Sequence, residues 1–83
     1  MYLFNKNSLN ALNVHWISGT IPPFPLHCSA KIRYRQADQS CIVSSSANGH
    51  LQADFIEAQR AITPGQSVVF YQNEVCLGGG IIL

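Results

Sequence analysis

Residues 26–35 read LHCSAKIRYR, and no other stretch of the chain alternates apolar and polar side chains as regularly. One set of alternate positions is mainly apolar: Cys28, Ala30, Ile32 and Tyr34. The other set is polar and mostly cationic: His27, Ser29, Lys31, Arg33 and Arg35. Successive side chains of a β-strand point to opposite faces of its sheet. The stretch therefore predicts a half-buried strand with a cationic outer face.

Similar period-two patterns on both sides of this stretch predict further short strands. The expected strands are residues 9–17, 26–35, 40–46, a strand through Leu51, Ala53 and Phe55, and residues 67–71 and 75–77, followed by an apolar end at 81–83. A proline-rich loop at residues 18–25 and three short turns at Ala37-Asp38-Gln39, Thr63-Pro64-Gly65 and Gln72-Asn73-Glu74 separate them. Asn48-Gly49 predicts a two-residue hairpin, because a type I′ turn needs positive φ at both central residues. Gly78-Gly79-Gly80 is typical of a sharp bend or a close approach between strands.

Many short strands without a credible helix predict an all-β fold, either a sandwich or a small barrel. We expect a closed antiparallel β-barrel of about six strands, because closure removes edges that a chain of low charge has few means to protect. The 83 residues make a single domain. Residues 1–8 are expected to be a linker or the lead-in to the first strand, and residues 9–83 the barrel.

The charge of the chain is low for a protein surface. Charged residues make up 11% and hydrophobic residues 47% of the sequence, and the formal net charge is +1. Average soluble domains carry about 25% charged residues. Part of the surface is therefore expected to face other protein, and any nucleic-acid interaction has to depend on where the few cations lie.

The cysteines, histidines and acids form no recognisable catalytic or metal-binding pattern. Cys28, Cys41 and Cys76 contain no CxxC pair, so we expect them to be reduced, metal-free and at least partly buried. The three histidines lack metal-ligand spacing, and the four acids do not form a pair suited to acid–base chemistry. The sequence thus predicts no catalytic residue and no metal site.

The N-terminal residues lack the features of a signal peptide, and no apolar run approaches the roughly 20 residues that span a bilayer. A cytoplasmic location without membrane contact is expected.

Three stretches together give the chain a family resemblance: KIRYRQAD at residues 31–38, AITPGQSVVFY at 61–71 and EVCLGGGII at 74–82. In this order and spacing they resemble the C-terminal domain of bacterial tRNA-specific 2-thiouridylases, which place sulfur on the wobble uridine of certain tRNAs. His15-Trp16-Ile17 is similar to the strand that opens that domain, so the resemblance extends from about residue 8 to the end.

The resemblance implies a barrel of the elongation-factor domain-2 type at the C-terminal end of a larger enzyme. It implies that ATP, Mg²⁺ and the catalytic cysteines belong to domains upstream of the barrel, and that this part has no cofactor of its own. The implied partners are tRNA, the upstream catalytic domain of the same chain and a sulfur-carrier protein. Cys28, Cys41 and Cys76 do not match the family's catalytic cysteines.

With that resemblance, the cationic face is interpreted as an RNA contact. Lys31, Arg33 and Arg35 would bind phosphates, and Gln36 would hydrogen-bond a sugar or a base edge. The alternatives are a barrel that mainly packs against protein, and an OB-like binder of single strands that stacks bases on exposed aromatic rings. We expect Trp16 and Tyr34 to pack in the core, and Phe24 to lie on the surface as a further candidate contact.

Overall fold

The computed structural model describes residues 5–32, 37–60 and 62–83. It contains six strands and a single 3₁₀ turn, Ala47–Gly49, between the third and fourth strands. The strands are β1 (Asn5–Trp16), β2 (Leu26–Lys31), β3 (Gln39–Ser45), β4 (Leu51–Arg60), β5 (Ser67–Gln72) and β6 (Val75–Ile82).

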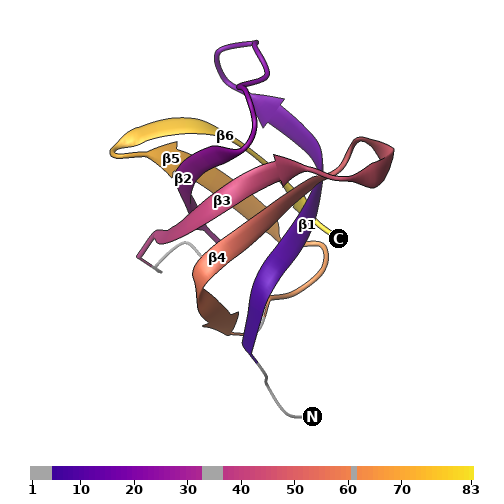
Figure 1. The fold of residues 1–83 in the computed structure, drawn as a ribbon, viewed down its shortest axis with the longest axis vertical. Helices are drawn as coiled ribbons and strands as arrows, with labels where there is room; N and C mark the ends of the chain where they lie inside the picture. Colours follow the sequence, from indigo (N-terminus) through magenta and orange to yellow (C-terminus); the bar gives the residue numbers. More distant parts are fainter. Residues whose placement is uncertain (1–4, 33–36, 61) are drawn as a thin grey trace.

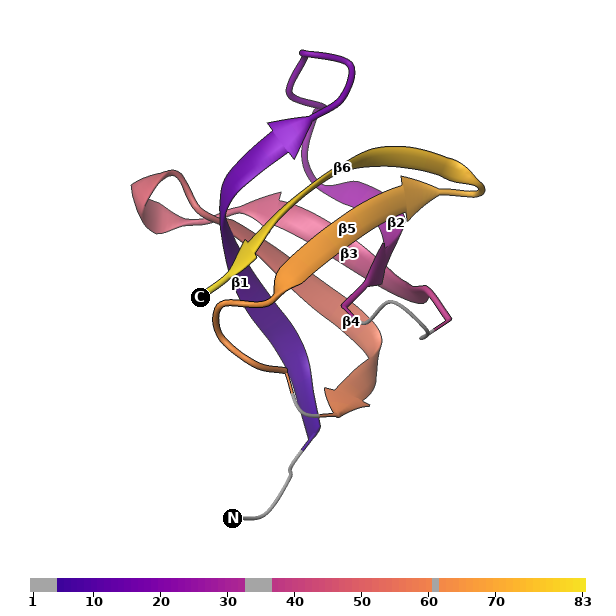
Figure 2. The same cartoon turned by 180° about the vertical axis from the view of Figure 1, so that it is seen from behind.

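The strands form a closed barrel in the order β1-β4-β3-β2-β5-β6, with β6 paired back to β1 (Figures 1 and 2). All six pairings are antiparallel. The ladder continues past the last strand, where the Leu83 backbone N–H donates to Asn10 O at 2.9 Å. The predicted all-β fold, a closed antiparallel barrel of about six strands, is confirmed.

The buried side chains of the described residues are apolar except for Gln59. Phe70, Val43 and Val68 are fully buried, and the Trp16 ring stacks on Phe70 with 6.0 Å between ring centroids. The buried core residues come from all six strands and from the bend that follows β2: Leu9, Ala11, Trp16, Ala30, Ile32, Cys41, Val43, Leu51, Ala53, Phe55, Val68, Phe70 and Ile82. The alternation that predicted an inward face for Ala30 and Ile32 is therefore confirmed.

The glycine run lies inside β6, which continues from Val75 to Ile82 instead of ending before the glycines as predicted. A Cβ on Gly79 would come within 2.6 Å of Val68 O, and one on Gly80 within 2.8 Å of Leu12 O. A Cβ on Gly78 would collide with the backbone carbonyl of His15. The close strand approach expected of these glycines is confirmed, because β6 lies between β1 and β5 and their backbones leave no room for a side chain at the three glycine positions.

Two predicted turns differ from the structure. Gln39 is the first residue of β3 and pairs with Ala30, so the chain reverses direction before the predicted turn at Ala37-Asp38-Gln39 is complete. The Asn48-Gly49 reversal has the expected positive φ values of 63° and 76°. However, the ladder resumes only at Ser45 and Leu51, so the connection between β3 and β4 is longer than the predicted two-residue loop.

The strand boundaries lie closer to the predicted ones than the turns do. The first strand begins at Asn5, within the segment 1–8 expected to precede it, and ends at Trp16. The fourth strand runs on to Arg60, through part of what was predicted as a separate segment at 59–62. The hairpin at Gln72-Asn73-Glu74 is close to the prediction, because Gln72 pairs with Val75 and Asn73 adopts a φ of 53°.

Candidate nucleic-acid interface

The predicted RNA-binding row begins on the outer face of β2, at its last residue. Lys31 is half-buried and pairs with Val69 of β5. Arg33, Arg35 and Gln36 lie outside the described residues, so Lys31 is the one member of the predicted site whose surroundings can be given. Regular β2 ends at Lys31, and Ile32 lies in a bend.

The Lys31 side chain lies over an aromatic ring. Its Nζ is 5.6 Å from the centroid of the Tyr71 ring, within the roughly 6 Å at which a cation–π attraction acts. The ring therefore restricts where the ammonium group can reach a phosphate.

Carboxylates share the space around Lys31. A shallow cavity of about 170 Å³ is lined by Lys31, Tyr71 and Asn73 together with Asp38 and Glu74. Both acids are exposed. Two carboxylates near one ammonium group oppose the approach of an anion, so Lys31 alone is a weak phosphate site. RNA contact here requires the cations that follow Lys31 in the sequence.

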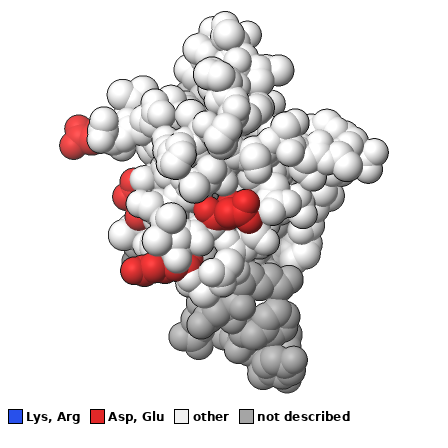
Figure 3. Space-filling view, viewed as in Figure 1, with Lys and Arg blue, Asp and Glu red and all other residues white. Residues whose placement is uncertain are grey.

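All four acids of the chain lie among the residues that the structure describes. The face shown in Figure 3 carries several acidic groups and no basic group among the atoms drawn as described. On β4, Asp54 accepts a hydrogen bond from Gln52 Nε2 at 2.9 Å. Asp54 thus adds negative charge to β4.

The aromatic side chains do not form an exposed stacking platform in the described part of the chain. Trp16, Phe55 and Phe70 are buried, which confirms the core role predicted for Trp16. Phe24 was expected on the surface, and this prediction is wrong. Its ring is partly buried against the core, and its centroid lies 6.4 Å from that of the Trp16 ring. Tyr34 lies outside the described residues.

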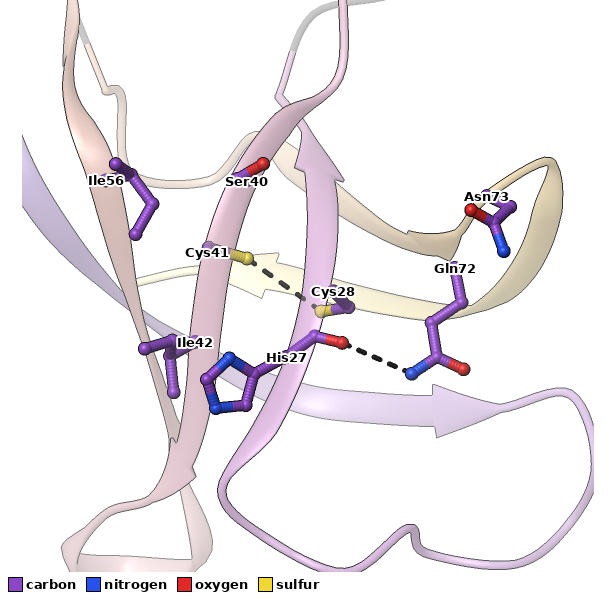
Figure 4. A pocket seen from close by; sticks show the side chains of 8 residues that line it. All are labelled: His27, Cys28, Ser40, Cys41, Ile42, Ile56, Gln72 and Asn73. Atoms are coloured by element: carbon purple, nitrogen blue, oxygen red, sulfur yellow. Dashed lines mark hydrogen bonds between the residues drawn. The ribbon is translucent and has the colours of Figure 1, made fainter.

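A larger cavity lies across β2, β3 and the β5–β6 hairpin (Figure 4). It has a volume of about 470 Å³, and His27, Ser40, Gln72 and Asn73 supply its polar groups. Gln72 Nε2 donates to His27 O at 3.2 Å, which ties the hairpin to β2. Cys28 and Cys41 also line this cavity, and their Sγ atoms are 3.9 Å apart.

This pairing of thiols is not predicted by the sequence. Cys28 and Cys41 occupy inward positions of neighbouring strands, which the alternation around Cys28 already indicated. Their direct opposition depends on the register of β2 against β3, and the misplaced turn at residues 37–39 hid it. The prediction that the cysteines are at least partly buried is confirmed, since Cys41 is buried and Cys28 and Cys76 are half-buried.

The residues described do not fit the ATP and Mg²⁺ that the family resemblance implies for a parent enzyme. No group of three or more histidine, cysteine or acidic side chains gathers there in a way that could hold a metal ion. The glycines of β6 cannot cradle a phosphate, because the carbonyls of neighbouring strands pack against them. We therefore assign no chemical step in this chain to either group.

No helix in the described ranges is long and apolar enough to cross a lipid bilayer.

Comparison with known proteins places the barrel in a defined class. The family model of the aminomethyltransferase β-barrel domain matches residues 6–82, and the chain belongs to this family. Its similar relatives include the tRNA-specific 2-thiouridylase MnmA of Marinomonas sp. (strain MWYL1), which is 56% identical over 77 residues. The same-named protein of Francisella tularensis subsp. novicida (strain U112) is 52% identical over 81 residues. The predicted resemblance to the C-terminal domain of tRNA-specific 2-thiouridylases is confirmed.

The matches cover most of this chain but a small part of each relative. The Marinomonas alignment covers 93% of the chain and 20% of the relative, and the Francisella alignment covers 98% and 23%. The chain thus spans about a fifth of the length of these relatives.

Proposed function

We propose that this barrel is a non-catalytic domain that positions tRNA for a 2-thiouridylase. The observation that carries the proposal is the identity of 52% or more to proteins named tRNA-specific 2-thiouridylase, along nearly the whole chain. The sulfur transfer, the ATP and Mg²⁺ it would need, and the contact with a sulfur-carrier protein would belong to the remaining four-fifths or so of such an enzyme. A cytoplasmic location follows from this role.

The proposed RNA contact consists of Lys31, Arg33, Arg35 and Gln36. Phosphate contacts fix the orientation of a nucleic acid without reading its sequence, and a closed barrel is a rigid support for them. Two acids line the cavity beside Lys31, so the two arginines are expected to contribute most of the attraction.

The test replaces Lys31, Arg33 and Arg35 together by glutamine in the full-length enzyme and measures tRNA affinity at several salt concentrations. Removal of each phosphate contact should lower the log–log slope of affinity against salt by roughly 0.7–0.9. The triple variant should stay folded, and a melting curve checks this, because none of the three residues belongs to the buried core of the described residues. The double variant Lys6→Gln/Arg60→Gln, which removes cations outside the row, is the control and should keep more of the affinity. An unchanged affinity and slope in the folded triple variant would reject the contact.

An apolar groove favours a second role, packing against protein. Trp16, Ile17, Pro22, Leu26 and Val75 line a groove of about 260 Å³ at the end of the barrel. Ile17 is 62% and Val75 63% exposed, which is unusual for large apolar side chains near one another. Under this alternative the triple variant keeps both its tRNA affinity and its salt dependence.

A further inference from the structure

Two cysteines that are 13 residues apart in the sequence lie side by side in the barrel wall. Cys28 of β2 and Cys41 of β3 are direct partners in the antiparallel ladder. Their Sγ atoms are 3.9 Å apart and point toward each other (Figure 4).

The backbone at this position already suits a disulfide. Directly opposed residues of an antiparallel pair have Cα atoms about 4.5–5.5 Å apart, and disulfides join Cα atoms about 4.4–6.8 Å apart. The sulfur atoms have to approach from 3.9 Å to about 2.05 Å, which rotation about the two Cα–Cβ bonds can supply. Neither strand has to leave the barrel.

The two thiols differ in their access to solvent. Cys41 is only 3% exposed, whereas Cys28 is half-buried, and both line the cavity of about 470 Å³ that opens to the surface. A hydrogen bond from the Cys41 thiol lowers the pKa of Cys28, although burial opposes this effect. The same hydrogen bond, burial and the nearby charge of Asp54 raise the pKa of Cys41. The thiolate, which is the attacking form in disulfide exchange, therefore forms at the more accessible sulfur.

We propose that Cys28 and Cys41 form a reversible disulfide by exchange with low-molecular-weight disulfides, with Cys28 as the attacking thiol and Cys41 as the resolving thiol. The site is independent of the tRNA-positioning role. Under reducing conditions both thiols remain free, as expected from their spacing in the sequence.

The reaction balances as two exchange steps. The Cys28 thiolate attacks one sulfur of a small disulfide RSSR, forms the mixed disulfide Cys28–S–SR and releases RS⁻. The Cys41 thiol then gives up its proton, and its sulfur attacks Cys28 Sγ and expels the second RS⁻. The two RS⁻ groups take up the two protons of the cysteines. The net change is two protein thiols and RSSR to one protein disulfide and two RSH.

The experiment incubates the reduced, folded 83-residue chain with bis(2-hydroxyethyl) disulfide at increasing ratios to 2-mercaptoethanol. Samples are quenched in acid, alkylated and mapped by peptide mass spectrometry. The expected product links Cys28 to Cys41, has a mass lower by about 2 Da because two hydrogens are removed, and disappears on reduction. Its melting temperature should be higher by several degrees, because the cross-link restricts the unfolded chain.

Three serine variants test the assigned roles. Cys76→Ser changes a half-buried cysteine outside the pair and is the matched control, so it should form the same link as the natural sequence. Cys41→Ser should accumulate the mixed disulfide on Cys28, because no thiol is left to resolve it. Cys28→Ser should leave Cys41 unmodified while the chain stays folded. Circular dichroism checks folding in each case.

The proposal is overturned if the natural chain forms no Cys28–Cys41 link at the most oxidising ratio, or if links to Cys76 form equally well. It is also overturned if folded Cys28→Ser reacts at Cys41 as fast as folded Cys41→Ser reacts at Cys28. Whether Cys28 and Cys41 form a disulfide is decided with the natural chain, even if a serine variant fails to fold.

Discussion

At the scale of single residues, the contact between Cys28 and Cys41 makes two chemically identical side chains behave differently. The pKa of Cys28 lies below its ordinary value of 9.0, because the thiolate accepts a hydrogen bond from Cys41. The pKa of Cys41 lies above 9.0, because that bond and burial favour its protonated form. Asp54 of the neighbouring strand β4 acts in the same direction on Cys41.

This difference predicts the pH dependence of alkylation. Only a thiolate reacts with iodoacetamide, and a lowered pKa supplies the thiolate at lower pH. In the folded chain the alkylation rate of Cys28 should therefore reach its midpoint below pH 9.0, and Cys41 should stay unmodified at that pH. Timed alkylation followed by peptide mass spectrometry measures both rates.

Cys41→Ala is the control for this prediction, because it removes the hydrogen-bond donor and keeps Cys28. The midpoint for Cys28 should then move to higher pH. If the midpoint stays where it was, the hydrogen bond between the two thiols is not what stabilises the thiolate.

At the scale of elements, β6 depends on its glycines to fit between its neighbouring strands. Glycine inside a strand ordinarily weakens it, yet β6 carries three in a row. The neighbouring backbones explain this, since a Cβ on Gly79 would meet Val68 O at 2.6 Å and Val69 Cα at 3.4 Å. The glycines let β1 and β5 come close enough to close the barrel.

Gly79→Ala should therefore destabilise the chain strongly. The contact is with backbone atoms, so relief requires a shift of β5 or β6 and should lower the free energy of unfolding by about 2 kcal/mol or more. Gly19→Ala is the matched control, because its Cβ would meet nothing within 4 Å and only the positive φ of 80° is unfavourable. That variant should be less stable by about 1 kcal/mol.

Urea unfolding of both variants measures the difference. Equal decreases at the two positions would contradict the claim that backbone contact, and not conformation alone, requires glycine in β6.

The sequence predicts elements better than the way they pair. Alternation, β-branched composition and the turns between them locate all six strands, although the last is predicted to end at Leu77 and runs on to Ile82. Register depends on where the chain turns, and Ala37-Asp38-Gln39 has turn-forming composition although Gln39 is already paired with Ala30. From the sequence, three consecutive glycines indicate a break in the strand, because glycine has a low strand propensity. Propensity takes no account of the neighbouring strands β1 and β5, whose backbones come too close to these positions for a side chain. The sequence also fails to predict the position of Phe24, because its contact with Trp16 depends on the path of the loop and not on local propensity.

At the scale of the whole molecule, the chain combines a closed barrel with few charges. Closure leaves no strand edge to protect, so a charged fraction of 11% is compatible with a stable fold. The acids lie in the described part of the molecule, and the cavity beside Lys31 is lined by two of them, Asp38 and Glu74. The sequence predicts that Lys31, Arg33 and Arg35 form one row. It does not predict that Asp38 and Glu74, which are far apart in the chain, both line the cavity beside Lys31.

The barrel should also lack thiolation activity when it is alone. Sulfur transfer to a base requires an activated leaving group and a sulfur nucleophile held against the same atom. Cys28 and Cys41 lie side by side in the barrel wall, and the residues described do not fit the ATP that would activate the base, so this part of the chain supplies thiols but no activated leaving group. Incubation of the 83-residue chain with ATP, Mg²⁺, a persulfide donor and unmodified tRNA should give no 2-thiouridine on nucleoside analysis by mass spectrometry. The full-length Marinomonas relative under the same conditions is the positive control. Thiolated product above the level of a heat-denatured sample would show that the barrel carries chemistry of its own, and the positioning role proposed for it would have to be abandoned.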